Sequence, residues 1–86
     1  MTMNVLKVFT QNIEVFSDLY HLLENLSLTE GQETEVEGVK VSGGGQVDEE
    51  YLDTMRVKLD VAVLKVKPGN VTILQHSGMF EVLFPE

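Results

Sequence analysis

A run of three glycines is the first feature of this 86-residue sequence that could do chemistry, since glycine-rich loops bind phosphate through their backbone N–H groups. Such loops follow a strand, open into a helix and carry a lysine followed by a hydroxyl residue. The run Ser42-Gly43-Gly44-Gly45 has no such lysine, and the next charged residues are Asp48, Glu49 and Glu50. These carboxylates would repel a phosphate. We therefore expect a flexible turn or open loop here rather than a nucleotide site.

The two histidines are the next candidates, for proton transfer or metal binding. His21 has Asp18 and Glu24 one helical turn away on either side, a pattern typical of a solvated helix residue. His76 is followed by Ser77, but adjacent residues of an extended chain point to opposite faces, and no Gly-x-Ser-x-Gly motif surrounds the serine. We therefore assign no catalytic residue and expect that the protein is not an enzyme.

The acidic residues between Asp48 and Asp53 could bind a cation. Calcium loops place oxygen ligands at alternating positions around a central glycine and end in a bidentate acid, and this run lacks that order. The sequence contains no cysteine, which excludes a thiolate zinc site and a disulfide framework. We expect neither a metal ion nor a cofactor.

The negative charge of the chain is concentrated in one segment. Eight carboxylates and a single base, Lys40, lie between Glu30 and Asp53, so this segment carries −7 of the net charge of −8. Such a field attracts basic proteins and repels nucleic acid, whose phosphates are bound by lysine and arginine. We therefore expect a basic protein partner and no direct nucleic-acid binding. A solvated surface without any partner would have the same composition.

The first part of the chain predicts a strand followed by a helix. Residues 3–9 are apolar and β-prone, and the segment 10–12 after them contains good N-cap residues. From about 12 to 26 the apolar period is helical and fills about half of the circumference, more than the roughly 100° that one contact surface needs. We expect part of this face to pack on a sheet and the rest to meet a loop or a second subunit. The apolar positions are Ile13, Val15, Phe16, Leu19, Tyr20, Leu22, Leu23 and Leu26.

The middle of the chain predicts two strands of unequal quality. Residues 33–41 alternate weakly around Gly38, which predicts a poor strand at a sheet edge or with a bulge. Residues 54–66 alternate strongly and predict the longest strand, whose far end is apolar on both faces and is therefore covered on both sides or bulged. On a regular strand Arg56 would point to the face opposite to Lys65, so we expect these bases to pair with the acidic segment rather than with a common ligand.

The last part of the chain completes an antiparallel meander. Lys67-Pro68-Gly69-Asn70 predicts a type II turn, and strands at 71–76 and 79–84 are joined by a tight connection at Ser77-Gly78. The order β-α-β-β-β-β predicts an α+β fold in a single small domain over residues 1–86. We expect a two-layer sandwich with one amphipathic helix, at about 12–26, packed on a mainly antiparallel sheet.

One helix cannot cover a five-stranded sheet, and the apolar remainder predicts a homodimer or a higher homo-oligomer. Phe80, Val82 and Phe84 share one face of the last strand, and at a sheet edge they would offer a backbone ladder with an apolar stripe. We assign these three residues to the oligomer interface. Tyr51 and Leu52, which stand among carboxylates, either anchor an interface or mark the entry of the chain into the core.

These features predict a small acidic protein-binding module, in the manner of an inhibitor or a nucleic-acid mimic, that docks a basic surface of its partner through residues 30–53. The alternative is a structural protein that acts by homo-oligomerisation through its uncovered sheet face. The sequence lacks a membrane-span-length apolar run and a secretion signal, so we expect no membrane contact and a cytoplasmic location. The predicted partner-binding residues are Glu35, Glu37, Asp48, Glu49, Glu50, Tyr51, Leu52 and Asp53.

Overall fold

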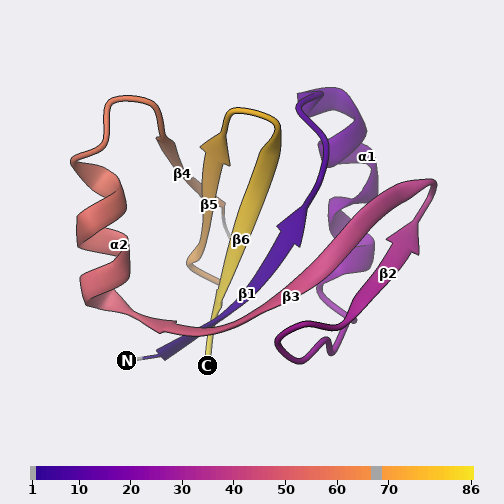
Figure 1. Cartoon of the computed structure of the whole chain (residues 1–86), viewed down its shortest axis with the longest axis horizontal. Coiled ribbons are helices and arrows are strands. Elements are labelled where there is room, and N and C mark those ends of the chain that lie inside the picture. The colour runs from indigo at the N-terminus through magenta and orange to yellow at the C-terminus, as the bar shows by residue number, and fades with distance from the viewer. Residues whose placement is uncertain (1, 67–68) are drawn as a thin grey trace.

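The computed structural model describes residues 2–66 and 69–86 and arranges them as two helices and six strands (Figure 1). The elements are β1 (Thr2–Val8), α1 (Ile13–Leu23), β2 (Glu33–Val36), β3 (Val39–Asp48), α2 (Glu49–Arg56), β4 (Ala62–Val66), β5 (Val71–His76) and β6 (Met79–Pro85). Lys67 and Pro68 of the predicted turn lie outside the described residues. Within the described ranges, neither helix is long and apolar enough to cross a membrane.

All six strands form one sheet in the order β2-β3-β1-β6-β5-β4, and each neighbouring pair is antiparallel. The edges are β2 and β4, while the last strand of the chain lies in the middle between β1 and β5. The predicted α+β class with an antiparallel sheet is confirmed. The segment 33–41, predicted as one poor strand at an edge or with a bulge, instead forms a hairpin of β2, a turn at Glu37-Gly38 and the start of β3, and only β2 lies at the sheet edge.

Helix α1 covers one face of this sheet, and the helix predicted at about 12–26 is thereby confirmed. The Asn12 side chain caps it by accepting hydrogen bonds from the backbone N–H groups of Glu14 at 2.9 Å and Val15 at 3.2 Å. The Phe16 ring stacks on the Phe80 ring, with 4.3 Å between the ring centroids. The buried core on this face consists of Leu6, Val8, Phe16, Leu19, Leu23, Val36, Val41, Val71, Ile73, Phe80 and Val82.

A second helix, α2, replaces the first part of the long strand predicted at 54–66, so that prediction is wrong. Asp48 caps α2 by accepting a hydrogen bond from the Tyr51 N–H at 3.2 Å, and the acids of the first turn and Arg56 in the last turn complement the helix dipole. The helix ends at Arg56 and β4 begins only at Ala62. The apolar residues of this segment suit a period of two, but the cap and the charges at the two ends favour a helix of eight residues.

Helix α2 lies on the sheet face opposite to α1. Successive residues of a strand point to opposite faces, and β1 divides accordingly. Leu6 and Val8 pack in the core beneath α1, whereas Met3 and Val5 pack with Leu52 of α2. The sheet therefore has a helix on each face, and the face that we expected to be uncovered is partly covered by α2.

The glycine run belongs to β3, so the flexible loop predicted there is wrong. A Cβ atom at Gly43 would stand 2.2 Å from the backbone oxygen of Thr29, and one at Gly44 would stand 2.7 Å from Cγ1 of Val5. Gly45 has a φ of +76° at the bulge where the register between β1 and β3 shifts. These glycines are explained by close packing and by the bulge, rather than by a need for flexibility.

Candidate functional site

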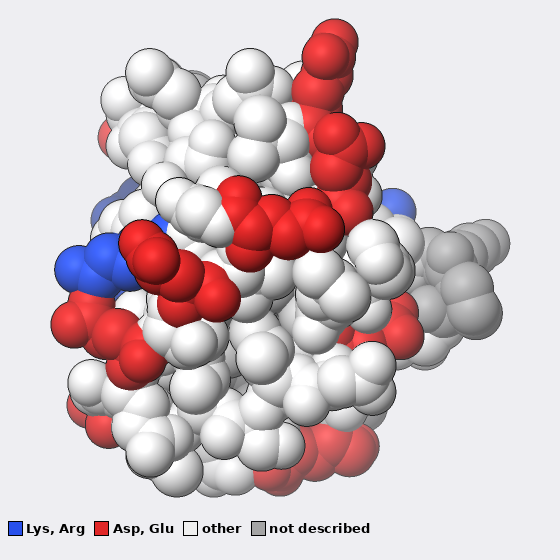
Figure 2. Space-filling model, turned by 90° about the vertical axis from the view of Figure 1, so that its right-hand side faces the viewer, with Lys and Arg blue, Asp and Glu red and all other residues white. Residues whose placement is uncertain are grey.

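Residues 30–53 do not form the single acidic surface that we expected. Glu33 and Glu35 lie on β2 at one edge of the sheet, while Glu49 and Glu50 lie on α2, beside β4 at the other edge (Figure 1). Figure 2 shows the side of the molecule that carries β2, where the carboxylates form separate groups with uncharged surface between them. The two halves of the segment are close in the chain, but β3 carries the chain across the sheet between them.

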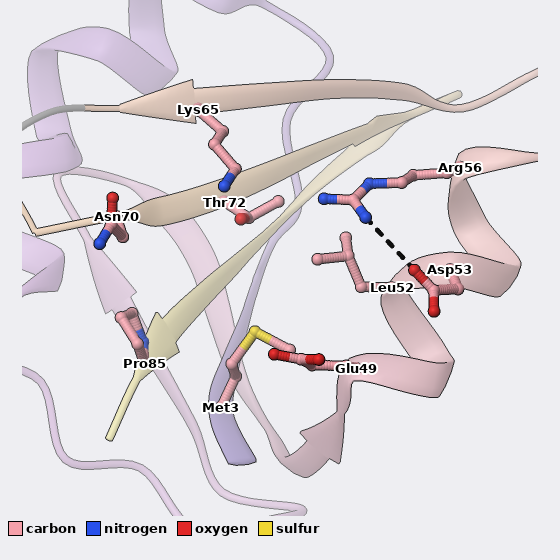
Figure 3. Close-up of a pocket in the computed structure, with 9 residues that line it drawn as sticks. All are labelled: Met3, Glu49, Leu52, Asp53, Arg56, Lys65, Asn70, Thr72 and Pro85. Carbon is pink, nitrogen blue, oxygen red and sulfur yellow. Dashed lines mark hydrogen bonds and ion pairs between the residues drawn. The ribbon is translucent and has the colours of Figure 1, made fainter. Parts of the chain in front are cut away.

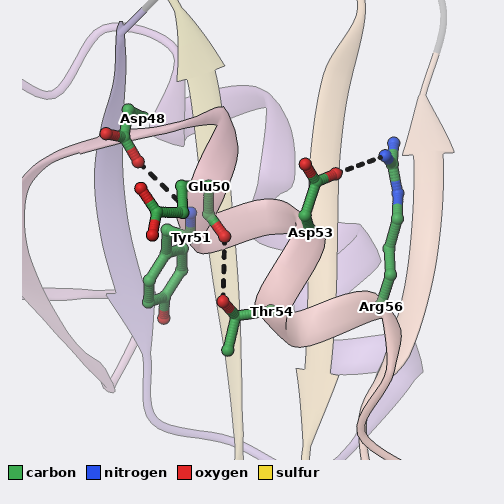
Figure 4. A network of polar contacts seen from close by, with 6 residues as sticks. All are labelled: Asp48, Glu50, Tyr51, Asp53, Thr54 and Arg56. Atoms are coloured by element: carbon green, nitrogen blue, oxygen red, sulfur yellow. Dashed lines mark hydrogen bonds and ion pairs between the residues drawn. The ribbon is translucent and has the colours of Figure 1, made fainter.

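Part of the acidic segment stabilises α2 itself (Figure 4). Asp48 caps the helix, and Oδ1 of Asp53 pairs with Nη1 of Arg56 at 3.2 Å, one turn further along. Both interactions use carboxylates that we had assigned to a partner. The other acidic residues that we predicted to contact a partner are also exposed on the surface: Glu35, Glu37, Glu49 and Glu50.

Tyr51 and Leu52 face the sheet. Leu52 is buried in the core beneath α2. The Tyr51 hydroxyl lies 2.9 and 2.8 Å from the two carboxylate oxygens of Glu81 and donates its proton to that group. Of the two alternatives for this pair, the structure shows the entry of the chain into the core.

Glu81 forms the centre of a buried polar cluster that the sequence analysis missed. The residue is 3% exposed, and the Nε2 atom of His76 also contacts its carboxylate. A carboxylate is expensive to bury unless it is hydrogen-bonded, and here the Tyr51 hydroxyl provides the hydrogen bond, while Nε2 of His76 lies against the carboxylate without a hydrogen bond of its own. The cluster joins α2 to β5 and β6. The feature of the sequence that could have revealed this cluster is Glu81, the single charged residue within the apolar run from Met79 to Phe84.

The Tyr51 hydroxyl predicts how stability changes at high pH. Burial, and then the hydrogen bond to Glu81 and its charge, raise the pKa of Tyr51 well above the ordinary value of 10.0. In the unfolded chain the phenol ionises near its ordinary pKa, so its contribution to stability is present below pH of about 10 and is lost as the pH rises further. We expect the free energy of unfolding, measured with urea at several pH values, to fall above that pH. The Tyr51→Phe variant should show a smaller slope, and an equal slope would contradict this assignment.

The residues assigned to an oligomer interface are core residues, so that prediction is wrong. Phe80 and Val82 have no exposed surface beneath α1, and Phe84 is partly buried against the same cluster. Their strand pairs with β1 on one side and with β5 on the other. The interface assignment depends on the last strand lying at a sheet edge, but long-range pairing with β1 places it in the middle of the sheet.

The exposed apolar surface lies instead around β4. Leu64 on this edge strand is 40% exposed, and Leu59 in the segment before it is fully exposed. Because Ala62, Leu64 and Val66 make its second face apolar, the sequence predicts that this end of the segment is covered on both sides or bulged. The same apolar second face was the signal that could have found this surface.

A groove of about 420 Å³ lies between β4 and α1. Ile13 of α1 and Leu64 of β4 line it and are 47% and 40% exposed, while Phe16 belongs to the buried core. Burial, and then the charge of Glu24, raise the pKa of Tyr20, which also lines the groove. An apolar groove with a carboxylate beside it and an open strand edge along one side can bind an extended peptide.

The described residues contain no group of three or more histidine or acidic side chains arranged to hold a metal ion. The structure thus contains two candidate functional features, the Glu81 cluster and the groove beside β4. In comparisons with protein-family models, curated proteins and solved structures, no match to this chain was found.

Proposed function

We propose that the protein is a non-enzymatic protein-binding module that takes up an extended segment of a basic protein along β4. The backbone of the partner would pair with the open edge of β4, and its apolar side chains would enter the groove between β4 and α1. The observation that carries this proposal is the open edge strand β4, with exposed apolar residues beside that groove.

The contrast between the two edges of the sheet supports the choice of β4. Natural sheets protect their edges with short strands and charged side chains. The edge strand β2 has four residues, of which Glu33 and Glu35 are charged and exposed. The edge strand β4 has the sequence Ala-Val-Leu-Lys-Val, in which the exposed residues are Ala62, Leu64 and a single charged residue, Lys65. An edge left this apolar is suited to pairing with another chain.

The charge of the protein supports a basic partner. The net charge is −8, and the surface of α1 beside the groove carries the exposed acids Glu14, Asp18 and Glu24. Attraction between this surface and a basic segment would mainly raise the rate of encounter and select the partner, while the groove would supply the buried area. In this proposal the acidic residues attract the basic partner through their electrostatic field, as the sequence predicts. The partner makes its direct contacts with β4 rather than with residues 30–53.

A second copy of the chain is the other occupant that an open edge could take, and it corresponds to the alternative assembly function. The free edge of β4 is the observation that favours it. Each copy carries −8, however, so pairing of two copies is opposed by repulsion. The two occupants therefore differ in the sign of their salt dependence, because salt screens repulsion and attraction alike.

A synthetic peptide of alternating lysine and valine tests the proposal directly. In a two-dimensional amide NMR titration, we expect the largest shift changes at residues 62–66 and at the groove residues of α1. Raising the salt from about 50 mM to about 500 mM should weaken binding at least about tenfold, as the Debye length contracts. A glutamate–valine peptide of the same length should not bind.

Two variants with the same change of charge separate the two edges of the sheet. Leu64→Lys, in the edge strand β4, should weaken peptide binding at least about tenfold through the lost apolar contact. Thr34→Lys, in the opposite edge strand β2, should leave it nearly unchanged. Equal effects of the two variants would overturn the proposal. A salt-stable dimer, measured by light scattering at both salt concentrations, would instead favour homo-oligomerisation.

A further inference from the structure

A second concavity, on the other face of the sheet, has a different chemistry from the groove. It measures about 330 Å³ and lies between α2 and the strands β4 and β5 (Figure 3). This volume is at the lower end of the range of pockets for small molecules, about 300–1,000 Å³. Its floor contains the apolar residues Met3, Leu52 and Pro85. It lies on the opposite face from α1 and shares Lys65 of β4 with the lining of the proposed protein-binding groove.

Two cations reach this pocket from different elements. Arg56 comes from the last turn of α2 and Lys65 from the middle of β4, and both side chains extend toward Thr72 (Figure 3). On the strand predicted from the sequence these two bases would point to opposite faces, so it is the helical turn of α2 that brings them together. Lys65 has no ion pair with any of the described residues.

Arg56 is held in place without using all of its donors. Its Nη1 atom donates to Asp53 at 3.2 Å, which fixes the guanidinium at the rim of the pocket. A guanidinium has five N–H donors, so most of them are left for another acceptor. Glu49 also lines the pocket, and its charge disfavours any ligand with a second negative group on that side.

The hydroxyl group of Thr72 lies between the two cations (Figure 3). Thr72 is 3% exposed and lines the pocket, and its hydroxyl takes part in none of the side-chain hydrogen bonds among the described residues. Of the buried polar side-chain atoms in the described residues, only Nε2 of His76 lacks a hydrogen-bond partner, so the Thr72 hydroxyl is not a buried unsatisfied group and faces the open space of the pocket. A valine would fill the same space on this strand but could not donate a hydrogen bond. The Thr72 hydroxyl can therefore donate to a ligand in the pocket.

We propose that this pocket binds a small molecule through one oxyanion, a carboxylate or a phosphate. The oxyanion accepts hydrogen bonds from the Arg56 guanidinium, the Lys65 ammonium and the Thr72 hydroxyl. Charge-assisted bonds of this kind are the strong class of hydrogen bond, and arginine is especially suited to oxyanions. Glu49 and Asp53 limit the site to ligands that carry little further negative charge.

Acetate and inorganic phosphate are the probes, titrated separately into labelled protein in a buffer free of both ions. We expect saturable shift changes at the amides of Arg56, Lys65 and Thr72. A response to acetate alone would assign the site to carboxylates, and a response to phosphate alone would assign it to phosphates. No saturable response to either probe would overturn the proposal.

Three variants distinguish a built site from general attraction of anions. Lys65→Gln and Thr72→Val should each weaken binding of the responding probe by about tenfold, the value of one hydrogen bond to a charged group. Lys58→Gln makes the same change of charge as Lys65→Gln at an exposed position that does not line the pocket, and it should have little effect. Thr72→Val changes no charge and should unfold at the same temperature or higher. Equal weakening by Lys58→Gln, or none by Thr72→Val, would contradict a specific site.

Discussion

Replacement of Phe80 by alanine is expected to lower the free energy of unfolding by about 3–5 kcal/mol. The ring has no exposed surface and stacks on Phe16 with the centroids 4.3 Å apart, so truncation removes a contact of α1 with the sheet and leaves a cavity. Domains of this size have only about 5–15 kcal/mol of stability in total. Much of the variant should therefore be unfolded near physiological temperature. Urea unfolding followed by circular dichroism measures the effect.

Phe9 provides the matched control for this substitution. It is also a phenylalanine but is 43% exposed, and Nζ of Lys40 lies over its ring, 5.3 Å from the ring centroid. Phe9→Ala should cost less than about 1 kcal/mol. If Phe80 formed an oligomer interface instead, the loss of stability in Phe80→Ala would depend on protein concentration. A midpoint that does depend on concentration would contradict the core assignment.

Replacement of Gly43 by alanine should cost nearly as much, about 3 kcal/mol, at the upper end of the range for overpacking. The new Cβ would meet the backbone oxygen of Thr29 at 2.2 Å, and no side-chain rotation can relieve a clash with backbone. The segment around residue 29 would have to move away from β3. That movement would break the bond from the Gly43 N–H to the Gln32 oxygen, at 2.8 Å, and the bond from the Gly31 N–H to the Gly43 oxygen.

Ser42→Ala is the control, in the neighbouring residue of the same strand. Its hydroxyl makes only one long contact, 3.4 Å to the Gly43 oxygen, so its removal should cost less than about 1 kcal/mol. Thermal unfolding of the two variants side by side gives the comparison. A Gly43→Ala protein as stable as Ser42→Ala would mean that the glycines form the flexible connection predicted from the sequence.

The two candidate sites explain different parts of the surface. The groove beside β4 accounts for exposed apolar residues that a solvated domain has no need to keep, such as Leu64 and Ile13. The proposed oxyanion site beneath α2 would account for the two cations and the hydroxyl of Thr72 that line one pocket in a chain with a net charge of −8. The buried carboxylate of Glu81 is accounted for within the fold by its hydrogen bonds from the Tyr51 hydroxyl.

The sequence by itself determined the features that depend on neighbours along the chain. The helical period and the cap at Asn12 predicted α1, and alternation with turn residues predicted β1, β5 and β6 within a residue or two. The same reasoning failed at 54–66, where a short amphipathic helix and a strand give similar patterns. At this point Asp48, as a helix N-cap residue, indicates the helix better than the apolar periodicity does. The sequence analysis interprets Asp48 only as part of the acidic segment.

Only the tertiary structure decided which residues are exposed and which meet. Pairing of β6 with β1 buries Phe80 and Val82, and it leaves β4 as the open edge. The path of β3 across the sheet divides the acidic segment, and the turn of α2 brings Arg56 to Lys65. The physical reason is that strand order and close backbone approach are set by contacts between residues far apart in the chain, which hydrophobic periodicity does not encode. Periodicity shows that a side chain will be buried, and the pairing of strands decides which residues it packs against.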